Sequence, residues 1–167
     1  MVEQARTELD AIELLLQDHR EVESLFRDFA HARKAGGVDV AQLISDACDE
    51  LIIHDKIEAE LFYPAVREAA DAEEIEDLLD DAEDDHDDML ELIEAIEDLD
   101  ADDATRDTQF AALAEQVTRH VQDEEATLFP HVRRLKALDL VALATQMKAR
   151  RSELMGDMGV AVEGETV

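Results

Sequence analysis

Apolar residues recur along four long segments of the chain at alternating spacings of three and four. This spacing lays the side chains along one face of an α-helix, so each segment predicts an amphipathic helix. The glycine pair Gly36-Gly37 and the prolines Pro64 and Pro130 mark expected ends or kinks. The predicted helices run from Asp10 to Ala35, from Asp39 to Tyr63, from Ala72 to Leu99 and from Thr105 to Phe129.

Four such helices with short connections predict an all-α fold, an up-down-up-down four-helix bundle over residues 10–137. A shorter helix, from about Asp139 to Leu154, is expected within residues 138–155. Residues 1–9 form an N-terminal extension in this interpretation, and residues 156–167 form a flexible tail.

Composition supports an all-helical chain, because hydrophobic residues reach 46% while aromatic residues make up 4%. The formal charge of −30 predicts repulsion from nucleic acids and from anionic membranes, so we expect neither as a partner. No apolar run approaches the ~20 residues of a membrane span. The first ten residues lack the basic start and apolar stretch of a signal peptide, which predicts a cytoplasmic protein. Its single cysteine, Cys48, allows neither an internal disulfide nor a thiolate zinc cluster.

Polar residues interrupt all four apolar faces at positions that should point into the core. A lone histidine on such a face is more often a hydrogen-bonded core residue than a metal ligand. A group of six changes this balance, because buried polar and charged groups are costly unless something compensates them, and a metal ion does so directly. The candidate ligands are His19, His54, Glu58, His86, His120 and Glu124.

The candidate ligands also repeat along the chain. The motif H-x-x-x-E occurs at His54 and at His120, and a proline follows ten residues after each histidine. The pairs Asp18-His19 and Asp85-His86 repeat as well, which suggests two helix pairs related by a pseudo-twofold axis and two metal ions. On one helix face, a histidine at i binds one ion while a carboxylate at i+4 bridges to the second. This leaves room for a bridging oxo or hydroxo group and for an open position that binds O2, H2O2 or NO. Imidazoles combined with carboxylates favour iron or manganese.

These motifs resemble the hemerythrin-like, or HHE cation-binding, family over about residues 10–135. The resemblance rests on the four-part histidine pattern and on three segments: Asp18-His19-Arg20, Glu-Leu-Phe-Tyr-Pro at 60–64 and Glu-Glu-Ala-Thr-Leu-Phe-Pro at 124–130. It implies a four-helix bundle around a non-haem di-iron centre. Carried over, His19 and His54 bind one iron, His86 and His120 bind the other, and Glu58 and Glu124 bridge the two.

The chain also departs from the oxygen-carrying members of that family. Those have a second histidine one turn from the first on the third helix, where this chain has Ala82 and Leu90, and an aspartate on the fourth helix in place of Glu124. The resemblance therefore favours the divergent bacterial members, which are implicated in peroxide breakdown, iron or oxygen sensing and repair of iron centres.

Several alternatives remain open at this stage. The protein is either an enzyme that destroys peroxide or reduces O2, or a non-enzymatic iron or oxygen sensor or iron-storage module. A ferritin-like carboxylate centre is disfavoured because the chain has a single E-x-x-H motif, Glu83-x-x-His86. Asp55 is either an extra oxygen ligand or a surface acid, and Glu23 could complete a third H-x-x-x-E. His31 and His131 lie off the repeat and are expected on the surface. Apolar residues beside the ligands predict a small dry pocket: Leu16, Phe26, Leu51, Phe62, Leu90 and Leu128.

Overall fold

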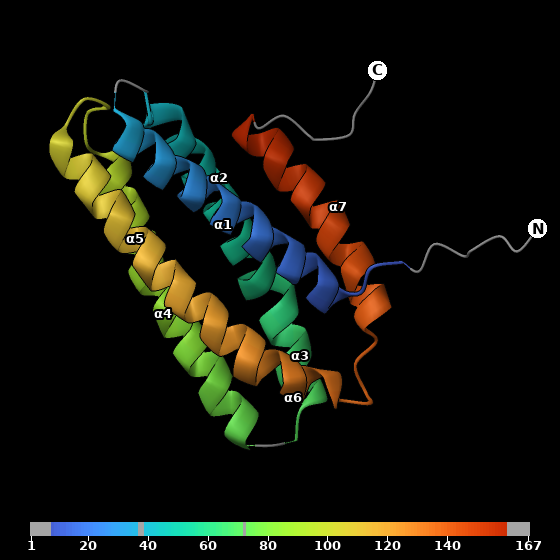
Figure 1. Cartoon of the computed structure of the whole chain (residues 1–167). Helices are drawn as coiled ribbons and strands as arrows, with labels where there is room; N and C mark the ends of the chain where they lie inside the picture. The colour runs from blue at the N-terminus through green and yellow to red at the C-terminus, as the bar shows by residue number, and fades with distance from the viewer. Residues whose placement is uncertain (1–7, 37–38, 72, 160–167) are drawn as a thin grey trace, which may run out of the picture.

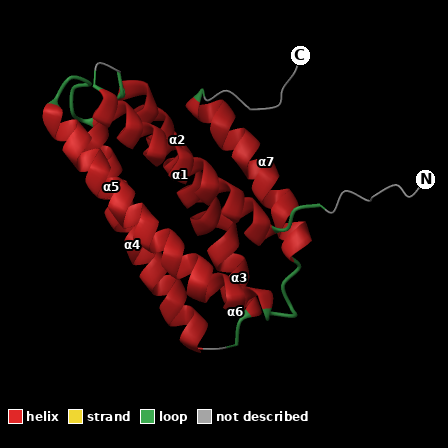
Figure 2. Ribbon diagram, viewed as in Figure 1, coloured by secondary structure: helices red, strands yellow, loops and turns green. Residues whose placement is uncertain are grey.

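The structure is a computed structural model that describes residues 8–36, 39–71 and 73–159, and these residues contain helices and no strand (Figures 1 and 2). In chain order the elements are α1 (Ala11–Ala35), α2 (Ala41–Ile57), the π-helical turn η1 (Glu58–Phe62), α3 (Tyr63–Ala69), α4 (Glu73–Glu97), α5 (Ala104–Asp123), the π-helical turn η2 (Glu124–Leu128), α6 (Phe129–Arg133) and α7 (Leu140–Met158).

The predicted up-down-up-down bundle with an additional C-terminal helix is confirmed. Helix α1 packs against α2, and α4 packs against α5. Contacts between α2 and α4 and between α1 and α5 join the two pairs into one bundle. Helix α7 lies outside the bundle, against α1, α2 and η1 (Figure 1).

Short polar residues begin three of the helices as the sequence leads one to expect. The Asp10 carboxylate accepts from the backbone N–H of Glu13 at 2.9 Å, and the Glu13 side chain accepts from the backbone N–H of Asp10 at 2.8 Å. This capping box satisfies two backbone donors that the first turn of α1 leaves open. Asp103 and Asp139 cap α5 and α7 by accepting from backbone N–H groups in the first turn.

The two prolines do not end their helices, which corrects the expected boundaries at Tyr63 and Phe129. Proline lacks an N–H, and its ring clashes with the carbonyl group four residues earlier in an α-helix. The π-helical turn before each proline relieves this clash. In η1 the N–H of Tyr63 donates to the carbonyl of Glu58, five residues earlier, and in η2 the N–H of Phe129 donates to the carbonyl of Glu124. The second and fourth bundle helices therefore continue through α3 to Ala69 and through α6 to Arg133.

The C-terminal helix is longer than predicted. Helix α7 runs through Gly156 to Met158, so the first residues of the expected flexible tail are helical. Leu154 and Met155 are buried, which holds this last turn against the bundle, and Gly159 ends the helix with a left-handed φ of 69°. The rest of the tail (160–167), most of the N-terminal extension (1–7) and the expected start of the third helix at Ala72 lie outside the described residues.

Buried apolar side chains form two clusters in the bundle, one toward each end. One cluster joins the first half of α1 with α3, the start of α4, α6 and α7. The other joins the second half of α1 with the starts of α2 and α5 and the end of α4. The candidate ligands occupy the levels between the clusters, since His19 lies between Leu15 of the first and Val22 of the second.

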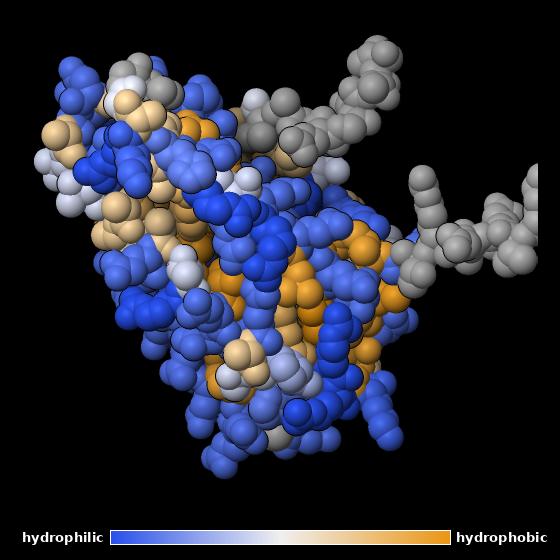
Figure 3. Space-filling view, in the orientation of Figure 1, coloured by the Kyte–Doolittle hydropathy of each residue, from blue (hydrophilic) through white to orange (hydrophobic). Residues whose placement is uncertain are grey.

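The outer surface matches the acidic composition. Hydrophilic residues cover much of the face seen in Figure 3, and apolar residues gather toward its middle. Of the large hydrophobic residues that the structure describes, Val141 is the most exposed, at 43%. None of the described helices has the length and apolar character needed to cross a bilayer.

Candidate metal centre

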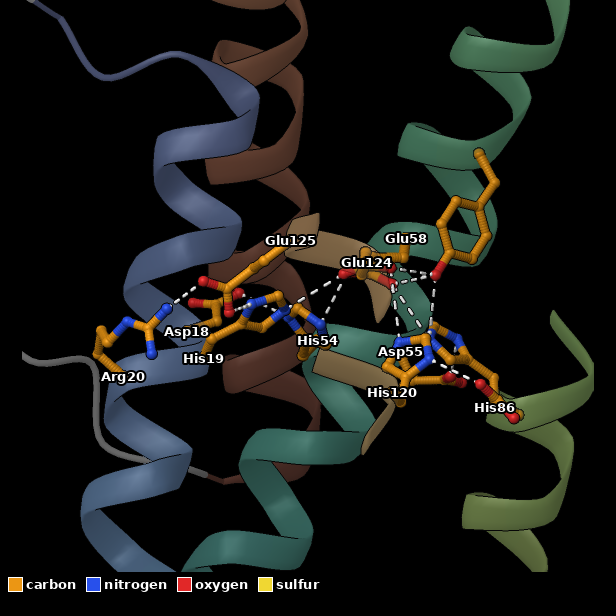
Figure 4. Close-up of polar contacts among 12 residues, drawn as sticks. Asp18, His19, Arg20, His54, Asp55, Glu58, His86, His120, Glu124 and Glu125 are labelled. Carbon is orange, nitrogen blue, oxygen red and sulfur yellow. Dashed lines mark hydrogen bonds and ion pairs between the residues drawn. The ribbon is translucent and has the colours of Figure 1, made fainter. Parts of the chain in front are cut away.

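The structure brings all six candidate ligands together in the bundle interior (Figure 4). Every one of them is 7% exposed or less. The six side chains come from four bundle helices. His19 lies on α1 and His86 on α4. His54 lies on α2 with Glu58 at the start of η1, and His120 lies on α5 with Glu124 at the start of η2. Both carboxylates thus stand where a helix widens into a π turn, a feature that often marks functional sites.

The first half of the centre consists of His19, His54, Glu58 and Glu124, with one ligand atom from each lying within 4.8 Å of the others. His19 Nε2 lies 3.2 Å from Glu124 Oε1, and His54 Nε2 lies 2.7 Å from Glu58 Oε1. None of these four buried atoms makes a hydrogen bond of good geometry. Four lone-pair donors aimed at one another without partners are costly in a bare protein, and a cation between them removes the cost.

The second half consists of His86 and His120 with the other oxygens of the same two carboxylates. The two Nε2 atoms are 3.0 Å apart, and His86 Nε2 is 3.1 Å from Glu58 Oε2. The hydroxyl of Tyr63 lies among them and donates to Glu58 Oε2 at 2.5 Å or to Glu124 Oε2 at 2.7 Å. It is also 3.1 Å from His86 Nε2.

Glu58 and Glu124 are therefore shared between the halves. Each carboxylate turns Oε1 toward the His19–His54 pair and Oε2 toward the His86–His120 pair. Two carboxylates that each face two imidazole pairs have the arrangement that a pair of bridged cations requires. The donor set of four imidazoles and two carboxylates fits iron, manganese or zinc.

A carboxylate faces the outer nitrogen of each histidine. The Nδ1 atoms of His54 and His19 lie 3.0 Å from Asp18 and 3.1 Å from Glu125. His120 Nδ1 lies 3.3 Å from Asp85, and His86 Nδ1 contacts Asp55. Such a partner holds the proton on Nδ1, so that Nε2 keeps its lone pair toward the interior, and it makes the imidazole a stronger donor.

The buried histidines and carboxylates shift one another's pKa values. Burial alone would lower the pKa of His86, but Asp55 and Glu58 raise it to about 10. Burial would likewise lower the pKa of His54 and of His120, but the facing carboxylates raise both pKa values above the ordinary value. Burial would raise the pKa of Glu58 and Glu124, but the imidazoles hold both below the ordinary value. In the metal-free bundle, protons on His54, His86 and His120 thus supply positive charge that a cation would bring.

Tyr63 remains neutral at this position. Burial and the two neighbouring carboxylates raise the pKa of its hydroxyl well above the ordinary value. The sequence analysis did not select this residue, although the repeat offered a signal. The residue at the same place in the second copy is Phe129, which stacks on His19 with a centroid distance of 5.8 Å. The hydroxyl is thus one polar difference between the two copies.

Asp55 is not a surface acid, since it is 9% exposed and contacts the outer nitrogen of His86. It lies outside both ligand groups. Glu23 accepts from Arg20 at 2.7 Å and also lies outside both groups. His31 is exposed, and His131 is half-buried, with its Nδ1 2.8 Å from the Thr127 carbonyl.

A small cavity of about 20 Å³ adjoins the histidines, which is room for about one water-sized molecule. Of the expected apolar neighbours, Leu51 and Leu90 line it, whereas Phe26 packs against Phe110. The remaining apolar lining comes from residues that the sequence analysis did not select: Val22, Met89, Ile93, Val117 and Val121.

Comparison with known proteins agrees with this architecture. The family model described as "Hemerythrin HHE cation binding domain" matches residues 10–155, which includes most of α7. A solved structure of a hemerythrin HHE cation-binding domain-containing protein from Mycobacterium kansasii aligns with a TM-score of 0.71 and 21% identity, covering 89% of each chain. At that identity the likeness concerns the fold. No curated protein matches the chain.

The raised pKa of His86 predicts how the stability of the metal-free protein depends on pH. A folded-state pKa of about 10, against an ordinary value of 6.5, gives stability that is full below pH 6.5 and is lost as the pH rises toward 10. We expect the free energy of unfolding, measured with a chelator present, to fall by a few kcal/mol over this window. His86→Asn should reduce the dependence, with His54 and His120 supplying what remains, and His31→Asn should leave it unchanged. A free energy that stays constant across the window in the unsubstituted protein would contradict the electrostatic description.

Proposed function

Because this chain belongs to the hemerythrin HHE cation-binding domain family, we propose that its buried cluster holds two non-haem iron ions that bind or react with O2, H2O2 or NO. The observation that carries the proposal is the sharing of Glu58 and Glu124 between two histidine pairs. A single cation would use one oxygen of each carboxylate and leave the opposite pair of imidazoles buried against one another.

Each residue of the cluster has a defined part in this proposal. His19 and His54 hold one iron, His86 and His120 hold the other, and Glu58 and Glu124 bind both. Asp18, Glu125, Asp85 and Asp55 orient the four imidazoles through Nδ1. When bound, the iron pair supplies redox-active positions at which a small oxygen or nitrogen ligand is bound and exchanges electrons.

The surrounding residues favour a small ligand. The adjoining cavity has room for about one water-sized molecule, which favours a ligand as small as O2 or peroxide. Its apolar lining, such as Leu51, Leu90 and Val117, keeps bulk water away from the histidines. Tyr63 provides an O–H between the two shared carboxylates, and its raised pKa keeps the proton on the hydroxyl.

We favour peroxide detoxification as the reaction, in the form of disproportionation of two H2O2 to O2 and two H2O. The support for this choice is the combination of a small pocket with apolar lining and a carboxylate and histidine donor set. The same features also serve a module that binds iron or a diatomic ligand without turnover, and assays of turnover distinguish the two.

The ligand assignment predicts a sharp difference among histidine variants. After loading with ferrous iron and desalting, His54→Ala and His120→Ala should each retain fewer irons per chain than the unsubstituted protein, because each loses an imidazole and unbalances a buried carboxylate. His31→Ala is the matched control, since this exposed histidine lies on the same helix as His19. A loss of iron in His31→Ala combined with full retention in His120→Ala would contradict the assignment.

The proposed reaction predicts O2 evolution when the iron-loaded protein is mixed with H2O2, above the rate given by the same concentration of free iron. His120→Ala should abolish the excess, and His31→Ala should preserve it. If a protein that retains its iron evolves no O2 above free iron, catalase-type turnover is wrong and the binding-module alternative replaces it.

A further inference from the structure

The four carboxylates that face the outer histidine nitrogens are of two kinds. On the His19–His54 side, both are also paired with an arginine. Arg151 of α7 donates to Asp18, and Arg20 of α1 donates to Glu125 (Figure 4 shows the second pair). The two guanidinium groups offset most of the negative charge of these carboxylates, although Arg20 is also shared with Glu23.

The His86–His120 side lacks such cations. Within the described part of the chain, neither Asp55 nor Asp85 forms an ion pair with an arginine or a lysine. Both carboxylates keep their full charge toward His86 and His120. The outer layer on this side is therefore the more negative of the two.

Solvent exposure does not explain why the surroundings of Asp18 and Asp55 differ. The side chains of Asp18 and Asp55 are 7% and 12% exposed, so both are shielded from water to a similar extent. The difference between them is the guanidinium of Arg151. A carboxylate shared with a guanidinium is a weaker acceptor for an imidazole N–H, and the imidazole is then a weaker metal donor.

Arg151 reaches the centre from outside the four-helix bundle. Helix α7 is fixed against the bundle by buried Leu143, Met147 and Leu154, which brings Arg151 to Asp18. The neighbouring Arg150 donates to Glu60 of the same chain.

We propose that Arg151 is a positioning residue that acts through Asp18 and His54 to make the two metal positions unequal. The position at His86 and His120 binds a cation more tightly and holds its ferric state at the lower potential. The position at His19 and His54 is filled second and reduced first. This inference rests on the proposed function, since it requires that the cluster hold two irons.

The test is a redox titration of the full-length protein loaded with two irons, followed by electron paramagnetic resonance of the mixed-valence state. We expect two separate one-electron steps. In Arg151→Gln the potential of the higher step should fall, which narrows the difference between the two reduction potentials. Arg151→Lys should restore most of that difference. Changes to groups around metal ligands alter metal affinity by about 10–100-fold, and about tenfold in the preference for ferric iron corresponds to about 59 mV.

The control is Arg150→Gln on the same helix. Arg150 pairs with Glu60 and Glu153, so its substitution weakens the docking of α7 without touching Asp18. Equal shifts in Arg150→Gln and Arg151→Gln would overturn the inference, and so would two coincident steps in the unsubstituted protein. Arg20→Gln provides a second variant, because Arg20 is 56% exposed and acts on His19 through Glu125; it should shift the same step downward. Binding of fewer than two irons to the unsubstituted protein would instead overturn the proposed function and the inference together.

Discussion

Two carboxylates and four imidazoles are buried in the middle of an apolar bundle, and the arrangement of the residues around them depends on the electrostatic cost of that burial. Such groups must be compensated by protons, hydrogen bonds or a cation. The metal-free chain uses protons, which is why the pKa values of His54, His86 and His120 are raised and those of Glu58 and Glu124 are lowered. The same balance explains why a carboxylate faces the outer nitrogen of every histidine, and why the two apolar clusters lie on either side of the polar layer. In our account, a pair of cations takes over the role of the protons.

The pseudo-twofold repeat makes the two halves of the centre alike in their donors, and the exceptions to the repeat make their surroundings differ. The repeated residues, such as His54 and His120 or Glu58 and Glu124, provide two sets of donors of the same type. The exceptions give each half a different surrounding. Tyr63 corresponds to Phe129, so a hydroxyl is present in one half and a stacked aromatic ring in the other. Asp55 corresponds to Val121 and Glu125 corresponds to Ala59, so the carboxylates that face His86 and His19 come from unrelated positions. Helix α7 adds a further difference by supplying Arg151 to one half.

Much of the fold was predictable because it follows from local periodicity. The apolar spacing gave the bundle helices, Asp10 and Glu13 gave the start of α1, and the polar interruptions gave six side chains that the structure gathers in one place. Their role as metal ligands stays a prediction. The π turns were not predictable from local rules, because proline usually kinks or ends a helix and the wider turn depends on packing around it. The contacts of Asp55 with His86 and of Arg151 with Asp18 were not predictable for a different reason. The two residues of each pair are distant in sequence, and only the folded bundle brings them into contact.

The central claim is that two metal ions share Glu58 and Glu124, and an anaerobic titration of the metal-free protein with ferrous iron tests it most directly. The account predicts saturable binding with a break at two irons per chain, because each half of the centre offers two imidazoles and an oxygen from both carboxylates. A break at one iron would contradict the shared-carboxylate arrangement. The absence of saturable binding would mean that the six residues form a polar network held by protons alone.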